Sequence, residues 1–328
     1  MNKILIVCLL ILSLHAQDEY QLGKGVQVGS LPFYLGGYFS VDYRNLDGEN
    51  RYRVDDLAIL GYGSYEKLSY MLELEFKEFY VETHKNDTVE IKKDSKLHAE
   101  RVYIDYNFNE NYMLRVGKYN SSIGFWNLLP VNVLRETTSN PVSSSILFPK
   151  FTTGISTAYS SYDRGEFKID VMLQNNEDID DEYNNYKIDK HYGFGISYEI
   201  DDFTLKFNSG YFHKTMDEIP DDLYYFLISS KYESEKFQIL TEMGSQKSQD
   251  EFTTNFAGYI QGVYRFTEEH LGVVRVESYD DASTNTNDNL AIFGYTYRPL
   301  YPVAIKTEYQ FHSISKQNQF LFSFSVLF

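Results

Sequence analysis

The stretch QFLFSFSVLF, residues 319–328, ends the sequence with a large apolar side chain at every second position. Successive side chains of a β-strand point to opposite faces, so one face of this segment is wholly apolar and the other is partly polar. The apolar face holds Phe320, Phe322, Phe324, Val326 and Phe328, and the opposite face holds Ser323 and Ser325. A strand that faces lipid requires this arrangement. The alternative is an inner strand of a soluble β-sandwich.

Residues 1–16 have the pattern of a secretory signal peptide. Lys3 precedes a short apolar run, and small or polar residues lead to Ala16, after which we expect cleavage. The run is too short to span a bilayer as a helix. Residues 17–328 would then form a single outer-membrane β-barrel domain. Cys8, the only cysteine, would be removed, which excludes a disulfide, thiol catalysis or a cysteine metal site in the mature chain.

The composition excludes two further classes of protein. The chain has 47 acidic and 30 basic residues, a formal net charge of -17, whereas nucleic-acid binding needs a basic footprint. After the first sixteen residues there is no run of about eighteen apolar residues, so a helical membrane protein is excluded. The 30 tyrosines and 24 phenylalanines suit the aromatic girdles that barrels carry at both membrane–water interfaces.

Alternating segments of about ten residues recur along the chain, which is near the length that a tilted strand needs to cross a bilayer. We predict an all-β fold, a transmembrane antiparallel β-barrel of about sixteen strands, because single-chain bacterial barrels have an even number. The predicted strands cover residues 34–43, 53–63, 67–79, 97–108, 111–119, 151–160, 165–174, 190–200, 203–212, 222–232, 235–244, 252–265, 269–278, 289–298, 301–311 and 319–328.

The connections between these segments alternate in length. Those on one side are tight turns, and those on the other are long and polar, among them residues 44–52, 80–96 and 175–189. This asymmetry is typical of the periplasmic turns and extracellular loops of an outer-membrane barrel.

The third long connection, residues 120–150, is far longer than usual and is the most apolar of them. Its only charged residues are Arg135, Glu136 and Lys150. A segment this rich in apolar residues needs a surface to bury against, and the inner barrel wall is the nearest one. We therefore expect residues 120–150 to fold into the lumen as a constriction loop.

Residues 114–119 (LRVGKY), followed by residues 123–125 (IGF), resemble the strand-to-loop signature of the phosphate-selective O and P type porins and their broader relatives among gram-negative outer-membrane porins. The resemblance implies a sixteen-stranded, water-filled, commonly trimeric diffusion channel in the outer membrane of a gram-negative bacterium. It implies that the partners are outer-membrane lipid, small hydrophilic solutes or ions, and further copies of this chain in a homotrimer. The arginine ladder and lysine cluster of the phosphate-binding members are not traceable here.

Strand parity assigns many charged side chains to the lumen, because an arginine or lysine on the lipid face costs roughly 2 to 4 kcal/mol at the midplane. The bases are Lys77, Arg101, Arg115, Lys168, Lys206, Arg275 and Lys306, and the acids are Glu73, Glu75, Asp105, Asp170, Glu199, Glu277 and Glu308. The two signs nearly balance, which resembles the opposed rows of charge in general porins. The candidate pore-lining residues are Arg101, Arg115, Arg135, Glu136, Lys77, Glu73 and Asp105. The alternative is that such residues pair with one another and only hold the wall together.

An acidic cluster lies in one long connection and consists of Glu177, Asp178, Asp180, Asp181 and Glu182. Carboxylates can bind calcium, but the cluster has neither the glycine nor the spacing of a known calcium loop, which favours a solvated extracellular loop. The cluster and the net charge favour cation preference or none. We expect no metal and no cofactor.

These observations favour a porin that admits small hydrophilic solutes or ions by passive diffusion, without an enzymatic step. Two alternatives stay open. An adhesin or structural barrel would have long surface loops and a filled lumen. A barrel enzyme such as a phospholipase would need a Ser-His or Asp-His pair, but none of the histidines lies in a recognisable nucleophile motif.

Overall fold

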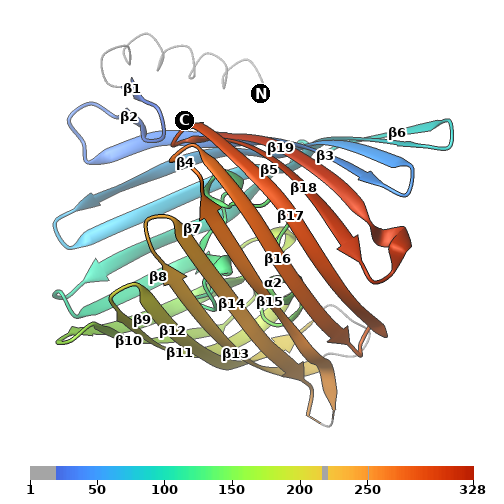
Figure 1. Cartoon of the computed structure of the whole chain (residues 1–328). Helices are drawn as coiled ribbons and strands as arrows, with labels where there is room; N and C mark the ends of the chain where they lie inside the picture. The colour runs from blue at the N-terminus through green and yellow to red at the C-terminus, as the bar shows by residue number, and fades with distance from the viewer. Residues whose placement is uncertain (1–19, 216–220, 250) are drawn as a thin grey trace.

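The computed structural model describes residues 20–215, 221–249 and 251–328 as one continuous antiparallel sheet of strands (Figure 1). The expected signal peptide, residues 1–16, lies outside the described residues. The strands of the sheet are β1 (Tyr20–Gln21), β2 (Gly25–Gln27), β3 (Phe33–Leu46), β4 (Glu49–Tyr65), β5 (Leu68–Lys85), β6 (Thr88–Lys93), β7 (Leu97–Asn107), β8 (Tyr112–Asn120), β9 (Phe151–Tyr162), β10 (Glu166–Asn175), β11 (Ile188–Ile200), β12 (Phe203–Lys214), β13 (Asp221–Glu233), β14 (Phe237–Lys247), β15 (Phe252–Arg265), β16 (His270–Asp281), β17 (Thr286–Leu300), β18 (Val303–His312) and β19 (Gln319–Leu327).

Sixteen of these strands close into a barrel, because the last strand pairs with the first wall strand. β19 runs antiparallel to β3, from Gln319 opposite Leu46 to Leu327 opposite Tyr38. Between them each wall strand pairs with its sequence neighbour, and β5 pairs with β7 past the short β6. Closure gives the described wall strands partners on both sides, which is what a strand needs in lipid. The predicted sixteen-stranded antiparallel barrel is confirmed.

The two faces of the wall have opposite chemistry. On β19, Phe322 is 40% exposed on the outer face, whereas Ser323 beside it is fully buried on the inner face. On β16, Val274 and Val276 point outward and flank Arg275, which has no exposed surface. Strand alternation therefore places apolar groups toward lipid and charged groups toward the interior.

The connections distinguish two ends of the barrel. The tight turns, such as residues 201–202 between β11 and β12 and residues 301–302 between β17 and β18, define the short-turn end. The longer connections define the long-loop end. Two predicted loops at that end are wrong, because most of residues 44–52 and most of residues 80–96 are strand.

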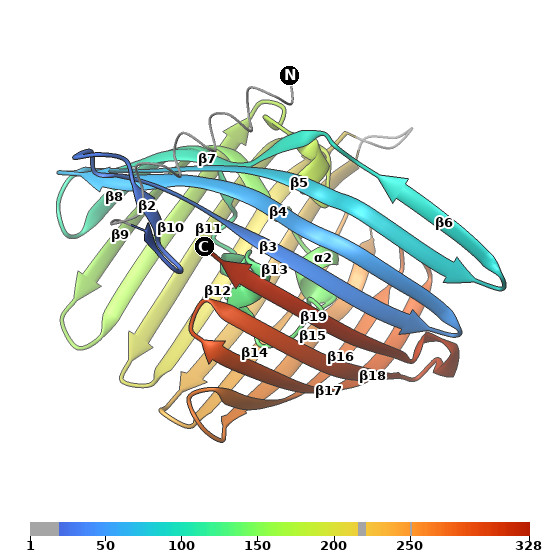
Figure 2. The same ribbon diagram turned by 90° about the horizontal axis from the view of Figure 1, so that it is seen from above.

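Two tight turns explain this difference. Asp47 and Gly48 both have positive φ, as do Asn86 and Asp87, which is the conformation of a two-residue hairpin whose twist matches its strands. The hairpins extend β3, β4, β5 and β6 beyond their neighbours (Figure 2). Every residue of β6 is exposed, Val89 and Ile91 included, so the β5–β6 hairpin has no buried inner face at β6 and extends beyond the closed wall.

Short helical turns lie in the connections and not in the wall. The segment between β8 and β9 contains η1 (Trp126–Leu128), η2 (Asn132–Leu134) and α2 (Ser143–Ile146), while η3 (Asp181–Tyr183) and η4 (Ser315–Gln317) lie in two other connections at the long-loop end. Among the described residues, no helix has the length and apolar character needed to cross a membrane.

Candidate functional site

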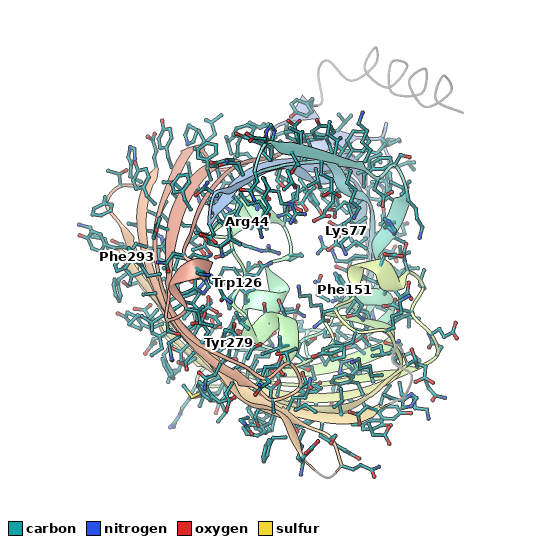
Figure 3. The ribbon with its side chains drawn as sticks, turned by 90° about the vertical axis from the view of Figure 1, so that its right-hand side faces the viewer. Arg44, Lys77, Trp126, Phe151, Tyr279 and Phe293 are labelled. Atoms are coloured by element: carbon teal, nitrogen blue, oxygen red, sulfur yellow. The ribbon has the colours of Figure 1, made fainter. Side chains whose placement is uncertain are left out.

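The segment of residues 120–150, here called the interior segment, lies within the ring of strands, where Figure 3 shows Trp126 and the short helical turns. Its two ends are joined, because the Ser121 amide donates to the Lys150 carbonyl at 2.8 Å. The Asn127 side-chain amide also donates to the carbonyls of Ser121 and Lys150, at 2.8 and 2.9 Å. These bonds close the segment at its base, next to the point where β8 ends and β9 begins.

Three buried glutamates of the wall accept hydrogen bonds from backbone amides of the interior segment. The segment has little regular structure, so its amides need acceptors once they leave water. The glutamates come from strands far apart in sequence, β14, β16 and β18, which together support one side of the segment. The pairs are Glu242 with Phe125 and with Trp126 (3.1 Å), Glu277 with Val142 (2.8 Å), and Glu308 with Thr138 (2.8 Å).

Four wall cations donate to oxygen atoms of the same segment. The pairs are Lys206 with the Gly124 carbonyl (3.0 Å), Arg275 with the Thr137 hydroxyl (2.8 Å), Arg298 with the Arg135 carbonyl (2.9 Å), and Lys306 with the Asn132 side-chain oxygen (2.8 Å). Parity placed Lys206, Arg275 and Lys306 inside the barrel, and they are buried there. Their role is neither to line an open passage nor only to pair with wall acids: they fix the backbone of the interior segment.

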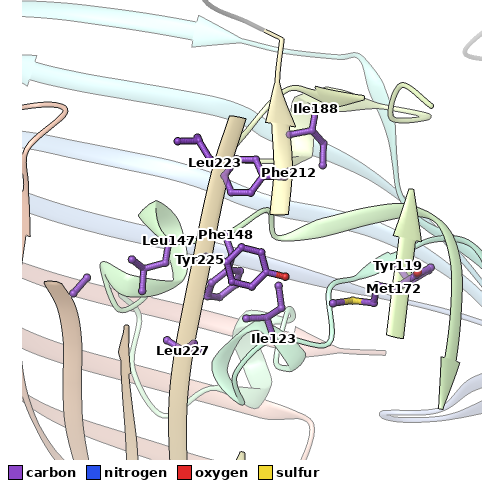
Figure 4. Packing of buried hydrophobic residues seen from close by; sticks show 11 residues of the cluster. Tyr119, Ile123, Leu147, Phe148, Met172, Ile188, Phe212, Leu223, Tyr225 and Leu227 are labelled. Atoms are coloured by element: carbon purple, nitrogen blue, oxygen red, sulfur yellow. The ribbon is translucent and has the colours of Figure 1, made fainter. Parts of the chain in front are cut away.

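Apolar packing completes this attachment. Ile123, Leu147 and Phe148 are buried against a cluster of inward side chains that includes Phe212 and Tyr225 (Figure 4). A second contact packs Trp126 against Leu240 and Tyr259. A third packs Val131 and Val133 against Tyr38, Ala58, Leu60 and Ala304. The interior segment is therefore packed, as its apolar composition requires.

A cavity of about 300 Å³, here called the side cavity, lies between the interior segment and the wall formed by β3, β4, β5 and β7. Its wall side carries four acids, Asp55, Asp56, Glu75 and Glu100, together with Arg53 and Lys77. The side formed by the interior segment carries Arg135 and Lys150. Lys77 and Phe151, which both line the side cavity, lie on either side of open space in Figure 3.

Arg135 is held in place by neutral groups. Its guanidinium donates to the Leu129 carbonyl at 2.6 Å, to the Asn140 side-chain oxygen at 2.7 Å, and to the Pro130 carbonyl. Burial lowers the pKa of Arg135, and the acids Asp56 and Glu100 oppose this shift. Arginine stays charged at any physiological pH, so a fixed positive charge faces the acidic wall.

Lys150 supplies a second, more adjustable charge beside Arg135. Burial lowers the pKa of Lys150 to about 8, and the nearby charges of Arg135 and Lys77 act in the same direction. The pKa of Glu136, by contrast, is raised by burial. Glu136 does not line the side cavity; its backbone carbonyl accepts a hydrogen bond from Thr296 at 2.6 Å.

Of the predicted pore-lining residues, the structure brings Arg135 and Lys77 to the side cavity. The ammonium of Lys77 also donates to the Glu182 carbonyl at 2.5 Å. Arg101 and Glu73 form an ion pair between β7 and β5, and the Glu73 side chain has no exposed surface.

Arg115 and Asp105 form another pair, with two hydrogen bonds of 2.6 and 2.8 Å, near the short-turn end. Asp105 lines a different cavity there, of about 480 Å³. The Arg101–Glu73 and Arg115–Asp105 contacts therefore match the alternative that inward charges pair with one another.

Sequence reasoning left Asp55, Asp56, Glu100 and Lys150 out of the candidate set. The pairing of β4 with β5 shifts register between Val54 and Asp56, which brings two consecutive aspartates to one cavity. Strict alternation would separate them. Lys150 is one of only three charged residues in residues 120–150, and this rarity is the feature of the sequence that could have marked it as a candidate.

The acidic cluster of residues 177–182 is not fully solvated, contrary to expectation. The side chain of Asp178 is buried, and its carboxylate lies 3.2 Å from the Lys118 ammonium; the Lys118 side chain has no exposed surface. Asp180 lies 3.1 Å from the ring of His98, and Asp181 is paired with Lys187 at 2.9 Å. The loop therefore folds back onto β7 and β8. A different acid group, Glu73, Glu75 and Glu100, has carboxylate oxygens within 4.8 Å of one another.

No protein-family model and no curated protein sequence matches the chain. Solved structures share its fold. The outer membrane channel DcaP of Acinetobacter baumannii aligns with a TM-score of 0.59 at 9% identity, over 93% of this chain and 100% of that chain. An anion-selective porin from Comamonas acidovorans aligns with a TM-score of 0.59 at 9% identity, over 90% and 99%. The trimer form of OmpT, an outer membrane protein of Vibrio cholerae, aligns with a TM-score of 0.61 at 10% identity, over 90% and 99%. The chain therefore has the fold of the outer-membrane porins.

Proposed function

We propose that this protein is a porin of the gram-negative outer membrane, a water-filled channel through which small hydrophilic solutes or ions diffuse passively. The observation that carries the proposal is a closed barrel with an apolar exterior and a charged interior that keeps a cavity beside the interior segment. A barrel of sixteen strands is wide enough for an aqueous passage. The solved structures of similar shape include proteins described as a channel and as a porin.

The interior segment acts as the constriction in this proposal. Its hydrogen bonds reach β12, β14, β16, β17 and β18, and its apolar contacts also reach β3 and β4. The passage is therefore the side cavity that remains between the interior segment and the inward side chains of β3, β4, β5 and β7. Arg135 and Lys77 line the passage directly. Arg101, Glu73, Arg115, Asp105 and Glu136 contribute through the field of their charges, because fixed charges near a narrow opening act on passing ions.

Ion preference follows from the lining of the side cavity. Four acids face it, together with four bases, of which Arg53 is itself paired with Asp55 at 2.9 Å. The resemblance to the phosphate-selective O and P type porins supports the connectivity and the position of the constriction. The carboxylates of the side cavity argue against a passage specialised for phosphate, so we propose weak cation preference or none.

A homotrimer in outer-membrane lipid is part of the proposal, supported by the trimer form of OmpT. Light scattering of the protein purified in detergent, corrected for bound detergent, measures the number of chains. A mass of three chains supports the trimer, and a mass of one chain contradicts it without contradicting the channel.

Planar-bilayer recording under a salt gradient tests the function itself. We expect stepwise openings and a reversal potential near zero or on the cation-selective side. If barrels shown to be folded insert without any openings, the proposal of a channel is refuted and the hypothesis of an adhesin or structural barrel is favoured. Hydrolysis of phospholipid by the same sample would instead indicate a barrel enzyme.

A further inference from the structure

The wall side of the side cavity also carries two bases: Arg53, which is paired with Asp55 at 2.9 Å, and Lys77, whose ammonium donates to the Glu182 carbonyl. The other charges that line the side cavity are segregated by sign. The carboxylates of Asp56, Glu75 and Glu100 come from three neighbouring wall strands, whereas Arg135 and Lys150 come from the interior segment on the opposite side. A solute in the side cavity therefore meets an acidic surface on one side and a basic surface on the other.

The three carboxylates of the acidic surface, Asp56, Glu75 and Glu100, have no ion-pair partner among the described residues. The Tyr38 hydroxyl lies 2.7 Å from a Glu75 oxygen and 3.1 Å from a Glu100 oxygen, and is a neutral partner for both. Carboxylates this close repel one another, and a cationic group placed beside them relieves that repulsion.

The two cations of the basic surface also have no ion-pair partner among the described residues. The hydrogen bonds of Arg135 go to neutral oxygens, so its charge is positioned but not paired. Lys150 Nζ makes neither a hydrogen bond nor an ion pair with the residues that the structure describes. A carboxylate group is the natural partner of such a surface, because both cations can donate hydrogen bonds to it.

We propose that the side cavity is a weak binding site for small zwitterionic solutes of the amino-acid class. The solute ammonium faces Asp56, Glu75 and Glu100, and the solute carboxylate faces Arg135 and Lys150. A solute with only one charge is attracted by one surface and repelled by the other, which reduces its net gain. The inference rests on the proposed function, since a solute must reach the side cavity through an open barrel.

Four solutes of equal size separate charge from shape: alanine (zwitterion), lactamide (neutral), alaninamide (cation) and lactate (anion). The measurement is the efflux rate of each radiolabelled solute from proteoliposomes that contain the full chain. Partly solvated charge pairs support a preference of roughly two- to fivefold for alanine over lactamide. A site this weak still releases the solute, as conduction requires.

Two variants test the two surfaces separately. Lys150→Met should bring the alanine-to-lactamide ratio close to one and raise alaninamide efflux, and Glu100→Gln should lower the same ratio and raise lactate efflux. The matched control is Lys236→Met, which removes one positive charge from an exposed turn between β13 and β14. It should keep the wild-type ratio.

The outcomes distinguish this inference from the proposed function. Equal efflux of alanine and lactamide through the wild-type channel overturns the zwitterion site and leaves the porin standing. Absence of efflux for all four solutes from liposomes with folded barrels overturns the porin. A wild-type preference for alanine that both Lys150→Met and Glu100→Gln retain also overturns the site, because the preference then arises elsewhere in the channel.

Discussion

Removal of the Lys306 ammonium should release part of the interior segment. The ammonium donates to the Asn132 carbonyl, to the Asn132 side-chain oxygen at 2.8 Å and to the Thr137 carbonyl at 3.3 Å. Lys306→Met keeps the length of the side chain and leaves these oxygens without their donor. Each buried acceptor without a partner costs about 1 to 3 kcal/mol, so the attachment weakens by roughly 2 to 4 kcal/mol after the lysine's own desolvation cost is subtracted.

That change is large enough to observe, because every 1.4 kcal/mol changes a population about tenfold. We expect higher single-channel conductance and more open-channel noise in planar bilayers. Trypsin provides a second measurement: it should cut the variant after Arg135, whose carbonyl accepts a hydrogen bond from Arg298 in the wild-type chain. Mass spectrometry identifies the cut.

The matched control is Lys168→Met on β10, because within the described residues the Lys168 side chain forms neither a hydrogen bond nor an ion pair. It should keep the wild-type conductance and remain uncut at Arg135. If Lys306→Met also keeps the wild-type conductance, noise and protease resistance, the inference that wall cations hold the interior segment is refuted.

Three other changes test separate parts of the structure. Burial lowers the pKa of Lys150 to about 8, so raising the pH from about 7 to about 9 should remove its charge. The reversal potential should then shift toward cation selectivity. Lys150→Met should abolish this pH dependence. Trp126→Ala removes a buried ring that packs on Tyr259 and should weaken the attachment of the interior segment by about 3 to 5 kcal/mol. Proteolysis within the interior segment should become faster. An unchanged rate of proteolysis would contradict the packing role of Trp126. Ile260→Arg places a charge on the lipid-facing wall and should lower the free energy of unfolding of the barrel by roughly 2 to 4 kcal/mol, measured by urea unfolding from vesicles. Asn287→Arg, near the long-loop end, should have little effect on it. Equal effects of the two variants would mean that Ile260 does not face lipid.

The wall of the barrel could be predicted from the sequence strand by strand. Each of the sixteen predicted segments corresponds to one wall strand, with ends that differ by a few residues. The prediction failed at the long-loop end, where residues 44–52 and 80–96 are largely strand. The segments are polar enough to resemble loops, and the two-residue turns with positive φ at Asp47–Gly48 and Asn86–Asp87 are what join them into hairpins.

The candidate site was predictable only in part. The length and apolar composition of residues 120–150 indicated a buried segment, and Arg135 was selected because charges are rare within it. Asp55 was missed because a register shift in β4 interrupts the alternation on which the parity argument depends. Arg115 was selected by the same parity, yet it is paired with Asp105 away from the side cavity.

The sequence by itself determined the sidedness of the wall, because a strand alternates its side chains through local backbone geometry that needs no distant partner. Only the tertiary structure decided what the inward charges do. Lys306 reaches Asn132 across 174 positions of sequence, and Glu242 reaches Trp126 across 116. Such contacts exist only after the barrel has closed, when irregular backbone removed from water must find its donors and acceptors on the opposite wall.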